Sequence, residues 1–207
     1  MCAALYLASQ SPRRQRLLDQ LGVRFKPLAV EIDEIWDSIE PVRDYVVRLA
    51  IEKAQAGWRK ISETKPLPVL GADTAVVLDD AILGKPSHRD EGLAMLACLS
   101  GRCHHVYTAM ALIVPPGDKQ QLRINLSRVH FRPLTTSDME AYWATGEPLG
   151  KAGGYAIQGL AAAFIERIEG SYSGVMGLPL YETAELLSLI GIDFLIRSRA
   201  QLAGPRY

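Results

Sequence analysis

Hydrophobic positions along this chain follow two different periods that alternate from one end to the other. Short apolar runs predict strands at residues 5–8, 25–30, 69–78, 81–83, 105–114, 122–131 and 162–168. Apolar residues at helical spacing, or capping residues ahead of such a segment, predict helices at residues 12–21, 41–60, 90–99, 137–144 and 179–190. Because strands and helices alternate without a visible repeat or linker, we expect an α/β fold with a mixed sheet.

The ends of several segments carry residues that favour caps or turns. Ser11 is a natural N-cap for the first helix, and Pro12 suits the first helical position because its missing N–H would be unpaired there anyway. The other predicted caps and turns are Ser87 ahead of the helix at 90–99, a capping box of Ser137 and Glu140, a turn at Asp79-Asp80 and a turn at 115–118 that joins an antiparallel pair.

Composition narrows the class of protein. The chain has 207 residues, of which 48% are hydrophobic and 22% charged, as in an ordinary globular protein. The 23 basic and 23 acidic residues cancel, and only 7% of the residues are aromatic, which argues against a nucleic-acid-binding module. Three cysteines without a CxxC motif indicate a reducing compartment. We expect a cytoplasmic protein with no membrane segment, because no basic n-region or long apolar run is present.

Arg13 and Arg14 stand at the start of the first helix, where the macrodipole already places about half a positive charge. In one interpretation both are solvated surface residues, at a cost of about 0.3–1 kcal/mol each. In the other, they and the free N–H groups of the helix form a site for a phosphate or carboxylate. The segment alone leaves both interpretations open.

Four further charged residues form, together with Arg13 and Arg14, a group whose charges suit one type of chemistry. Lys53 falls on the apolar stripe of the helix at 41–60, where it either snorkels to water or points inward toward an anion. Asp73 interrupts an apolar strand, Lys85 lies in an extended Gly-Lys-Pro segment, and Glu34 lies in an acidic stretch. Basic groups neutralise polyphosphate, and carboxylates hold a divalent ion and deprotonate water, so this set favours phosphoryl chemistry.

Other familiar sites find little support. Cys103-His104-His105 is a poor metal site, because neighbouring strand residues point to opposite faces. The chain has no GxSxG elbow, and the loop at 150–154 matches neither a dinucleotide-binding fingerprint nor a Walker A motif.

Seven short motifs occur in an order that resembles the Maf family of nucleoside triphosphate pyrophosphatases over essentially the whole chain. They are LASQSPRR at 7–14, IDE at 32–34, EKA at 52–54, GADT at 71–74, GKP at 84–86, KAGGYAIQG at 151–159 and GLPL at 177–180. The resemblance implies one domain over residues 1–207 with a fold similar to inosine triphosphate pyrophosphatases: an elongated mixed sheet with flanking helices and two lobes around a cleft. It also implies a homodimer, and hydrolysis of a nucleoside triphosphate to the monophosphate and pyrophosphate with Mg²⁺ or Mn²⁺.

The same resemblance assigns roles to residues. Asp73 would be the catalytic base and would share a metal with Glu34, while Ser9, Arg14, Lys53 and Lys85 would bind the triphosphate. The residues Arg13, Thr74 and Gln158 resemble the branch that acts on dTTP and UTP, and the amide of Gln158 suits the O4 and N3–H edge of uracil or thymine. One departure is Gly150, where close relatives are expected to carry aspartate. Two alternatives remain open: a 7-methyl-GTP pyrophosphatase and a non-catalytic nucleotide-binding regulator.

Overall fold

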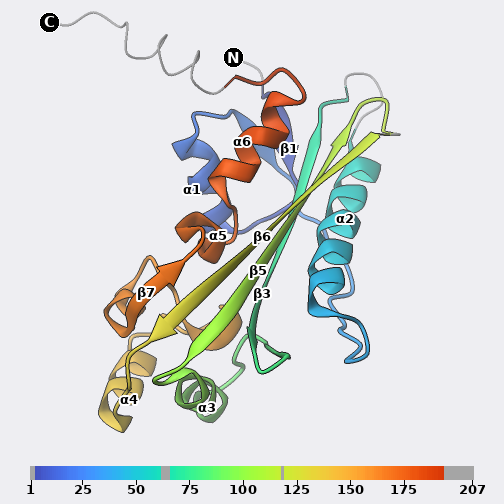
Figure 1. Ribbon diagram of the computed structural model, residues 1–207. Helices are drawn as coiled ribbons and strands as arrows, with labels where there is room; N and C mark the ends of the chain where they lie inside the picture. The colour runs from blue at the N-terminus through green and yellow to red at the C-terminus, as the bar shows by residue number, and fades with distance from the viewer. Residues whose placement is uncertain (1–2, 62–65, 118, 194–207) are drawn as a thin grey trace, which may run out of the picture.

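A computed structural model describes residues 3–61, 66–117 and 119–193 and shows one seven-stranded mixed sheet with helices on both faces (Figure 1). The strand order is β2-β1-β3-β5-β6-β7, and β4 pairs with β3. Strand β1 runs parallel to β2 and β3, whereas all other pairs are antiparallel. The expected α/β fold with a mixed sheet is therefore confirmed. The strands are β1 (Leu5–Leu7), β2 (Phe25–Pro27), β3 (Val69–Leu78), β4 (Ala81–Leu83), β5 (Cys103–Val114), β6 (Lys119–Phe131) and β7 (Ile165–Glu169).

Helices cover different parts of the sheet. Helix α2 packs on one face of β3 and β5, and α1, α5 and α6 lie on the other side, while α3 and α4 cover the far end of the long strands (Figure 1). The helices are α1 (Pro12–Gln20), α2 (Val42–Lys60), α3 (Arg89–Leu99), α4 (Thr136–Ala144), α5 (Tyr172–Met176) and α6 (Leu180–Ser188), with short 3₁₀ helices η1 (Ala152–Gly154) and η2 (Leu160–Phe164). None of the described helices is long and apolar enough to cross a membrane.

Strand β3 is buried on both faces, and its alternation divides the core. The even positions Leu70 and Ala72 pack toward α1 and α6, whereas the odd positions Ala75 and Val77 pack toward α2. Gly71 allows the close approach of α2, because a Cβ atom at this position would lie 2.5 Å from Ala54 N. The alternation thus points Asp73 and Thr74, in the middle of the strand, toward opposite sides of the sheet.

Several predicted ends of elements were wrong. Ser11 occupies the N-cap position of α1, but its side chain makes no capping hydrogen bond. The cap of α3 is His88, whose Nδ1 accepts from Glu91 N at 3.3 Å, and not Ser87. The capping box of α4 consists of Thr135 and Asp138, two residues before the predicted pair Ser137 and Glu140. Both sets satisfy the same spacing rule, so the sequence did not separate them.

The segment predicted as a strand at 162–168 begins as η2, and only its second half belongs to β7. The run at 25–30 forms a strand only over Phe25–Pro27, and the short helix α5 was missed. The turn at Asp79-Asp80 is confirmed, with φ of 49° and 63°. Residues 115–117 also form a turn, and Asp118 lies outside the described residues.

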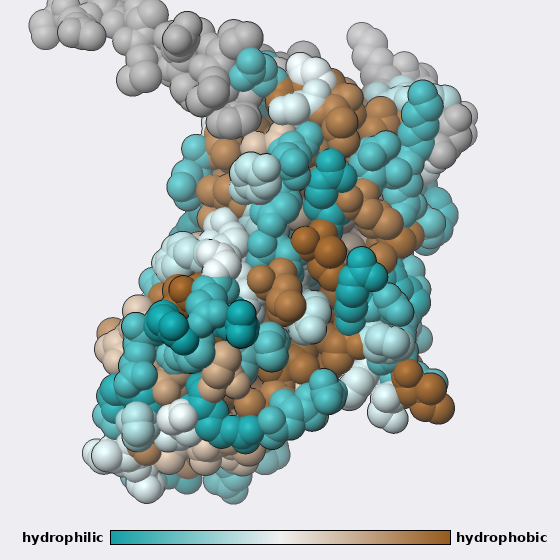
Figure 2. Space-filling model, in the orientation of Figure 1, coloured by the Kyte–Doolittle hydropathy of each residue, from teal (hydrophilic) through white to brown (hydrophobic). Residues whose placement is uncertain are grey.

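Apolar side chains are exposed over β6 on the face that Figure 2 shows. Leu122 is 39% and Leu126 49% exposed, and both lie on the strand face that points toward the α2 side of the sheet. The homodimer that the family resemblance implies stays a prediction.

Candidate active site

A cleft of about 410 Å³ opens where the start of α1, the middle of β3 and α2 meet the end of β4 with the residues after it (82–85) and the segment 150–158, which contains η1. Among the described residues, five cationic side chains and two carboxylates line it, so the cleft has a positive excess that suits a polyanionic ligand. The cations are Arg13, Arg14, Lys53, Lys85 and Lys151, and the carboxylates are Glu34 and Asp73.

Lys53 lies at the centre of the charged groups. Its Nζ is 2.6 Å from Glu34 Oε1 and 2.6 Å from Asp73 Oδ1, and its side chain is only 12% exposed. The interpretation in which Lys53 points inward toward an anion is therefore confirmed, and the snorkelling interpretation is wrong. The partners come from an irregular segment and from β3, 19 and 20 residues away in the chain, so helical periodicity could flag Lys53 but not identify them.

Glu34 is the more exposed of the two carboxylates. Burial raises its pKa, but the hydrogen bond from Lys53 and the charges of Lys53 and Lys85 outweigh burial, so the pKa lies below the usual value. Lys85 Nζ lies 3.5 Å from Glu34 Oε2 and its side chain is 60% exposed, which leaves it free to reorient toward a ligand.

Arg14 is fixed by the protein. Its Nε donates to Gly177 O at 2.8 Å, Nη1 to Ser9 Oγ at 3.3 Å and Nη2 to Thr74 Oγ1 at 3.2 Å. The hydroxyl of Thr74 also lies 3.0 Å from Thr108 Oγ1, which donates to Gly174 O. Ser9 therefore lies behind Arg14 and not in the lining of the cleft, and Thr74 contacts both Arg14 and the cleft.

Arg13 differs from its neighbour. Within the described residues it makes no hydrogen bond or ion pair to the protein, although it lines the cleft and is half-buried. Burial lowers the pKa of both arginines; for Arg14 the carboxylates of Asp73 and Glu34 act against this, and the charge of Arg13 adds to it. Burying two neighbouring guanidinium groups is unfavourable without an anion, so the geometry favours the anion-site interpretation over the surface interpretation.

Gln158 lies at the cleft on an exposed turn, about 80 residues beyond the strand that holds Asp73. The structure thus brings Arg13, Arg14, Glu34, Lys53, Asp73, Thr74, Lys85 and Gln158 to one cleft, with Ser9 directly behind it.

Three contributors to the cleft were not assigned a role from the sequence. Tyr45 donates its hydroxyl to Glu34 O at 3.0 Å, and burial together with the charges of Asp73 and Glu34 raises the pKa of Tyr45 to about 12. Lys151 extends the positive lining, and burial and the charge of Arg13 lower its pKa. Gly177 provides the carbonyl that orients Arg14. Lys151 and Gly177 belong to recognised motifs, whereas nothing in the local sequence distinguishes Tyr45.

Glu34 and Asp73 supply carboxylate oxygens, which are good ligands for a hard divalent cation. Among the described residues no group of three or more His, Cys, Asp or Glu side chains could hold a metal by itself. Mg²⁺ usually binds to one or two carboxylates together with water and substrate phosphates, so this pair fits a cation that arrives with a triphosphate. Outside the cleft, His104 Nε2 is hydrogen-bonded to Tyr155 OH at 2.8 Å in the core. His104 belongs to no group of three or more potential metal ligands among the described residues.

Comparison with known sequences finds related proteins over most of the chain. The family model for the Maf-like protein matches residues 4–190. A dTTP/UTP pyrophosphatase of Alkalilimnicola ehrlichii is 52% identical over 193 residues, which cover 92% of this chain and 94% of that protein. Proteins of the same name from Aromatoleum aromaticum and Burkholderia thailandensis are 49% and 50% identical, over 91% and 92% of this chain and 96% and 94% of their own lengths. The solved structure of the Staphylococcus aureus Ham1 protein aligns with a TM-score of 0.43 and 11% identity, over 61% of this chain and 71% of that one.

Proposed function

This chain belongs to the Maf-like family, and we propose that it is a nucleoside triphosphate pyrophosphatase that hydrolyses dTTP and UTP to the monophosphate and pyrophosphate. One observation carries the proposal: a carboxylate, Asp73, is held by Lys53 inside a cleft lined with an excess of cations. A carboxylate repels the phosphates themselves, so Asp73 favours a role beyond phosphate binding, namely to accept a proton from water and to help hold a divalent ion.

Asp73 acts as the general base of the reaction. It accepts a proton from water, the water oxygen forms a bond to the α-phosphorus, and the bond from that phosphorus to the bridging oxygen breaks, so that pyrophosphate leaves. Proton transfer to a positioned carboxylate contributes about 10²–10⁴-fold. Lys53 fixes the orientation of Asp73 through its 2.6 Å contact, and Arg13, Lys85 and Lys151 stabilise the charge that develops on the phosphates.

Glu34 and Asp73 would hold the divalent ion, Mg²⁺ or Mn²⁺. When bound, such an ion supplies charge neutralisation of the phosphates and lowers the pKa of a coordinated water. Tyr45 and Lys53 hold Glu34 in place for this role, through its backbone carbonyl and its carboxylate respectively.

Gln158 selects the base in this proposal. Its side chain offers one acceptor and a donor group, which match the N3–H and O4 of uracil and thymine. Arg13 lies at the same cleft and Thr74 orients Arg14, so all three residues that separate the pyrimidine branch from the 7-methyl-GTP branch contribute to the cleft or its wall.

The experiment is to measure pyrophosphate release from dTTP, UTP, CTP, GTP and 7-methyl-GTP, with Mg²⁺ or Mn²⁺, using Asp73→Asn as the matched variant. We expect fast release from dTTP and UTP and a loss of about 10²-fold or more in kcat in Asp73→Asn. A preference for 7-methyl-GTP would overturn the specificity. Nucleotide binding without hydrolysis in the wild-type protein would overturn the enzymatic function and leave a regulator.

A further inference from the structure

The turn that carries Gln158 is held from behind by two side chains outside the cleft. Gly159 N donates to Ala156 O at 3.0 Å and closes the turn over residues 156–159. Within this turn Ile157 is buried in the hydrophobic core, so Gln158 is directed outward to the cleft. Tyr155 and Ala156 are buried as well, but apolar burial is non-directional and leaves the peptide groups at the two ends of the turn free to rotate.

Tyr142 and Glu147 remove that freedom. The hydroxyl of Tyr142 accepts from Ala156 N at 3.1 Å and donates to Glu147 Oε1 at 2.7 Å. The carboxylate of Glu147 accepts from Leu160 N at 3.0 Å and from Ala161 N at 3.3 Å. The backbone is therefore bonded on both sides of Gln158, two residues before it and two and three residues after it.

Both side chains are themselves held in place. Tyr142 is 3% exposed, and its ring packs edge-on against Phe164 with the ring centroids 5.2 Å apart. Gly159 leaves room for the carboxylate, since a Cβ atom there would overlap Glu147. Burial raises the pKa of Glu147, but the N–H of Leu160 and the hydroxyl of Tyr142 outweigh it, so the net pKa lies below its usual value and the group is a carboxylate at neutral pH.

We propose that Tyr142 and Glu147 are positioning residues for base selection: they fix the 156–159 turn so that the amide of Gln158 faces the Watson–Crick edge of a uracil or thymine base. The inference rests on the proposed function, because it concerns which base that site accepts. Neither residue lines the cleft, so neither contacts the substrate. A purely structural role would instead lower stability or activity equally for every substrate.

The test compares kcat/KM for UTP, CTP and inorganic tripolyphosphate, which has no base. Tyr142→Phe removes one hydroxyl and keeps the ring that packs on Phe164. We expect the UTP to CTP ratio of kcat/KM to fall by roughly three- to tenfold, the range expected for the loss of one or two hydrogen bonds. Glu147→Gln, which weakens the bonds on the other side of the turn, lowers the ratio further. Hydrolysis of tripolyphosphate changes by less than about twofold in both variants.

Two controls separate positioning from general damage. Glu140 is an exposed residue of α4, the helix that carries Tyr142, and its carboxylate pairs with Arg89 at 2.8 Å. Glu140→Gln removes this carboxylate and should leave the UTP to CTP ratio unchanged. In a Gln158→Ala background, Tyr142→Phe should no longer change the ratio, because the residue through which it acts is gone. An equal change with and without Gln158, or an unchanged ratio, overturns the proposal.

Amide hydrogen exchange provides a readout that needs no catalysis. Tyr142→Phe and Glu147→Gln should speed exchange at Ala156, Leu160 and Ala161 while leaving the central part of β5 protected. Unchanged exchange at these three amides overturns the proposal even if the wild-type protein hydrolyses no nucleotide. Absence of hydrolysis by the wild type, with faster exchange in the variants, instead overturns the proposed function alone.

Discussion

Replacing Lys53 by methionine should reveal how strongly one ammonium stabilises two carboxylates. Methionine keeps an unbranched stem of similar length, so the change removes charge without opening a large cavity. Asp73, whose side chain is 10% exposed, and Glu34, whose side chain is 42% exposed, would then face each other without a cation between them. Removing one partner of a fully buried pair costs about 3–5 kcal/mol; since Glu34 is partly solvated, we expect about 2–4 kcal/mol at pH 7.

The pH dependence follows from the sign of the shift on Glu34. Its pKa is lowered in the folded protein, so it contributes stability above its unfolded value of 4.5 and loses that contribution as the pH falls through the folded pKa. In Lys53→Met the largest cause of the lowering is absent, so that burial, which raises the pKa of Glu34, is opposed only by Lys85. The stability difference between the two proteins should therefore be largest near pH 7 and should shrink below about pH 5.

Urea unfolding followed by circular dichroism, at pH 7 and pH 4.5, measures the loss of stability in Lys53→Met and its dependence on pH. Lys85→Met is the matched control, because Lys85 lies 3.5 Å from Glu34 but is 60% exposed, and its loss should cost less than about 0.5 kcal/mol. Saturating MgCl₂ should stabilise Lys53→Met more than the wild type, because the divalent ion takes over the neutralisation of the two carboxylates. Equal destabilisation by Lys53→Met and Lys85→Met would show that Lys53 is not the cation that neutralises both carboxylates.

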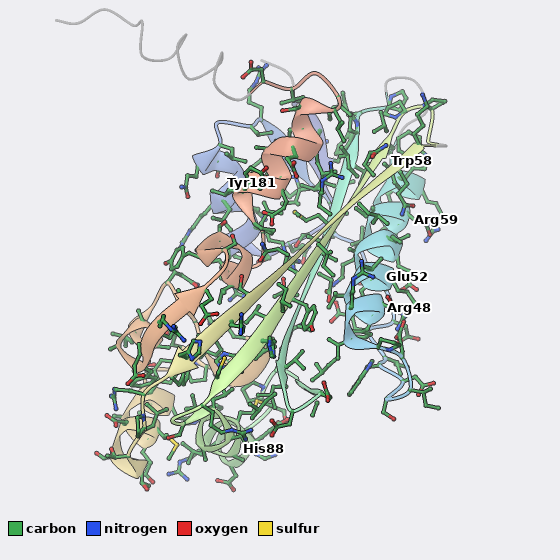
Figure 3. All side chains as sticks on the ribbon, viewed as in Figure 1. Arg48, Glu52, Trp58, Arg59, His88 and Tyr181 are labelled. Atoms are coloured by element: carbon green, nitrogen blue, oxygen red, sulfur yellow. The ribbon has the colours of Figure 1, made fainter. Side chains whose placement is uncertain are left out.

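Three further changes test other parts of the structure. Gly71→Ala places a methyl group against α2, 2.5 Å from Ala54 N, and should cost about 3 kcal/mol or more in urea unfolding, whereas Gly84→Ala, with open space around its Cβ, should cost little. On the outer side of α2, Arg48 donates hydrogen bonds to the carboxylate of Glu40, at 2.7 Å, and to the carbonyl of Ile35 (Figure 3). Arg48→Met removes both bonds and loosens the segment that carries Glu34, so KM for dTTP should rise by about three- to tenfold. Arg43→Met, at an exposed position, should have no effect. Burial, aided by the charges of His105 and His130, lowers the pKa of His104 to about 3. Below pH 6.5 the unfolded chain therefore binds a proton at His104 that the folded protein does not bind, which lowers the free energy of unfolding as the pH falls. His104→Leu should reduce the slope of the free energy of unfolding against pH by up to about 1.4 kcal/mol per pH unit. An unchanged slope would contradict this.

The sequence predicted the bounds of strands and helices well where the period of the hydrophobic positions and the length of the segment indicate the same element. Strand β3 and helix α2 lie within a residue of their expected bounds, because ten apolar-rich positions and a five-turn helical stripe leave few alternatives. The 162–168 segment failed because a short apolar run does not distinguish a strand from a 3₁₀ turn, and the cap of α4 failed because Thr135 and Ser137 both fit the pattern. Local rules set these ends only to within two residues.

The candidate site shows a different limit. Lys53 and Asp73 stood out because a charged residue in an apolar stripe or strand needs a partner, whereas Glu34, in an acidic stretch, joined them only because phosphoryl chemistry uses paired carboxylates and cations. The sequence did not indicate Tyr142 and Glu147, since both act on backbone N–H groups 13 to 14 residues away and carry no unusual pattern of their own. Arg14 and Gly177 are 163 residues apart, a separation at which only the assembled fold relates two positions.

The two adjacent arginines illustrate what the assembled cleft adds to the sequence. All three nitrogens of the Arg14 guanidinium group donate to protein oxygens, so Arg14 shapes the wall of the cleft and supplies charge from a fixed position. Arg13 makes no such bonds within the described part of the chain, so its five donors stay available to a ligand. Ser11 leaves the first N–H groups of α1 without a side-chain acceptor. The half-buried guanidinium group of Arg13, the fixed positive charge of Arg14 and the uncapped start of α1 all favour an anion here, and a bound polyphosphate would complement all three at once.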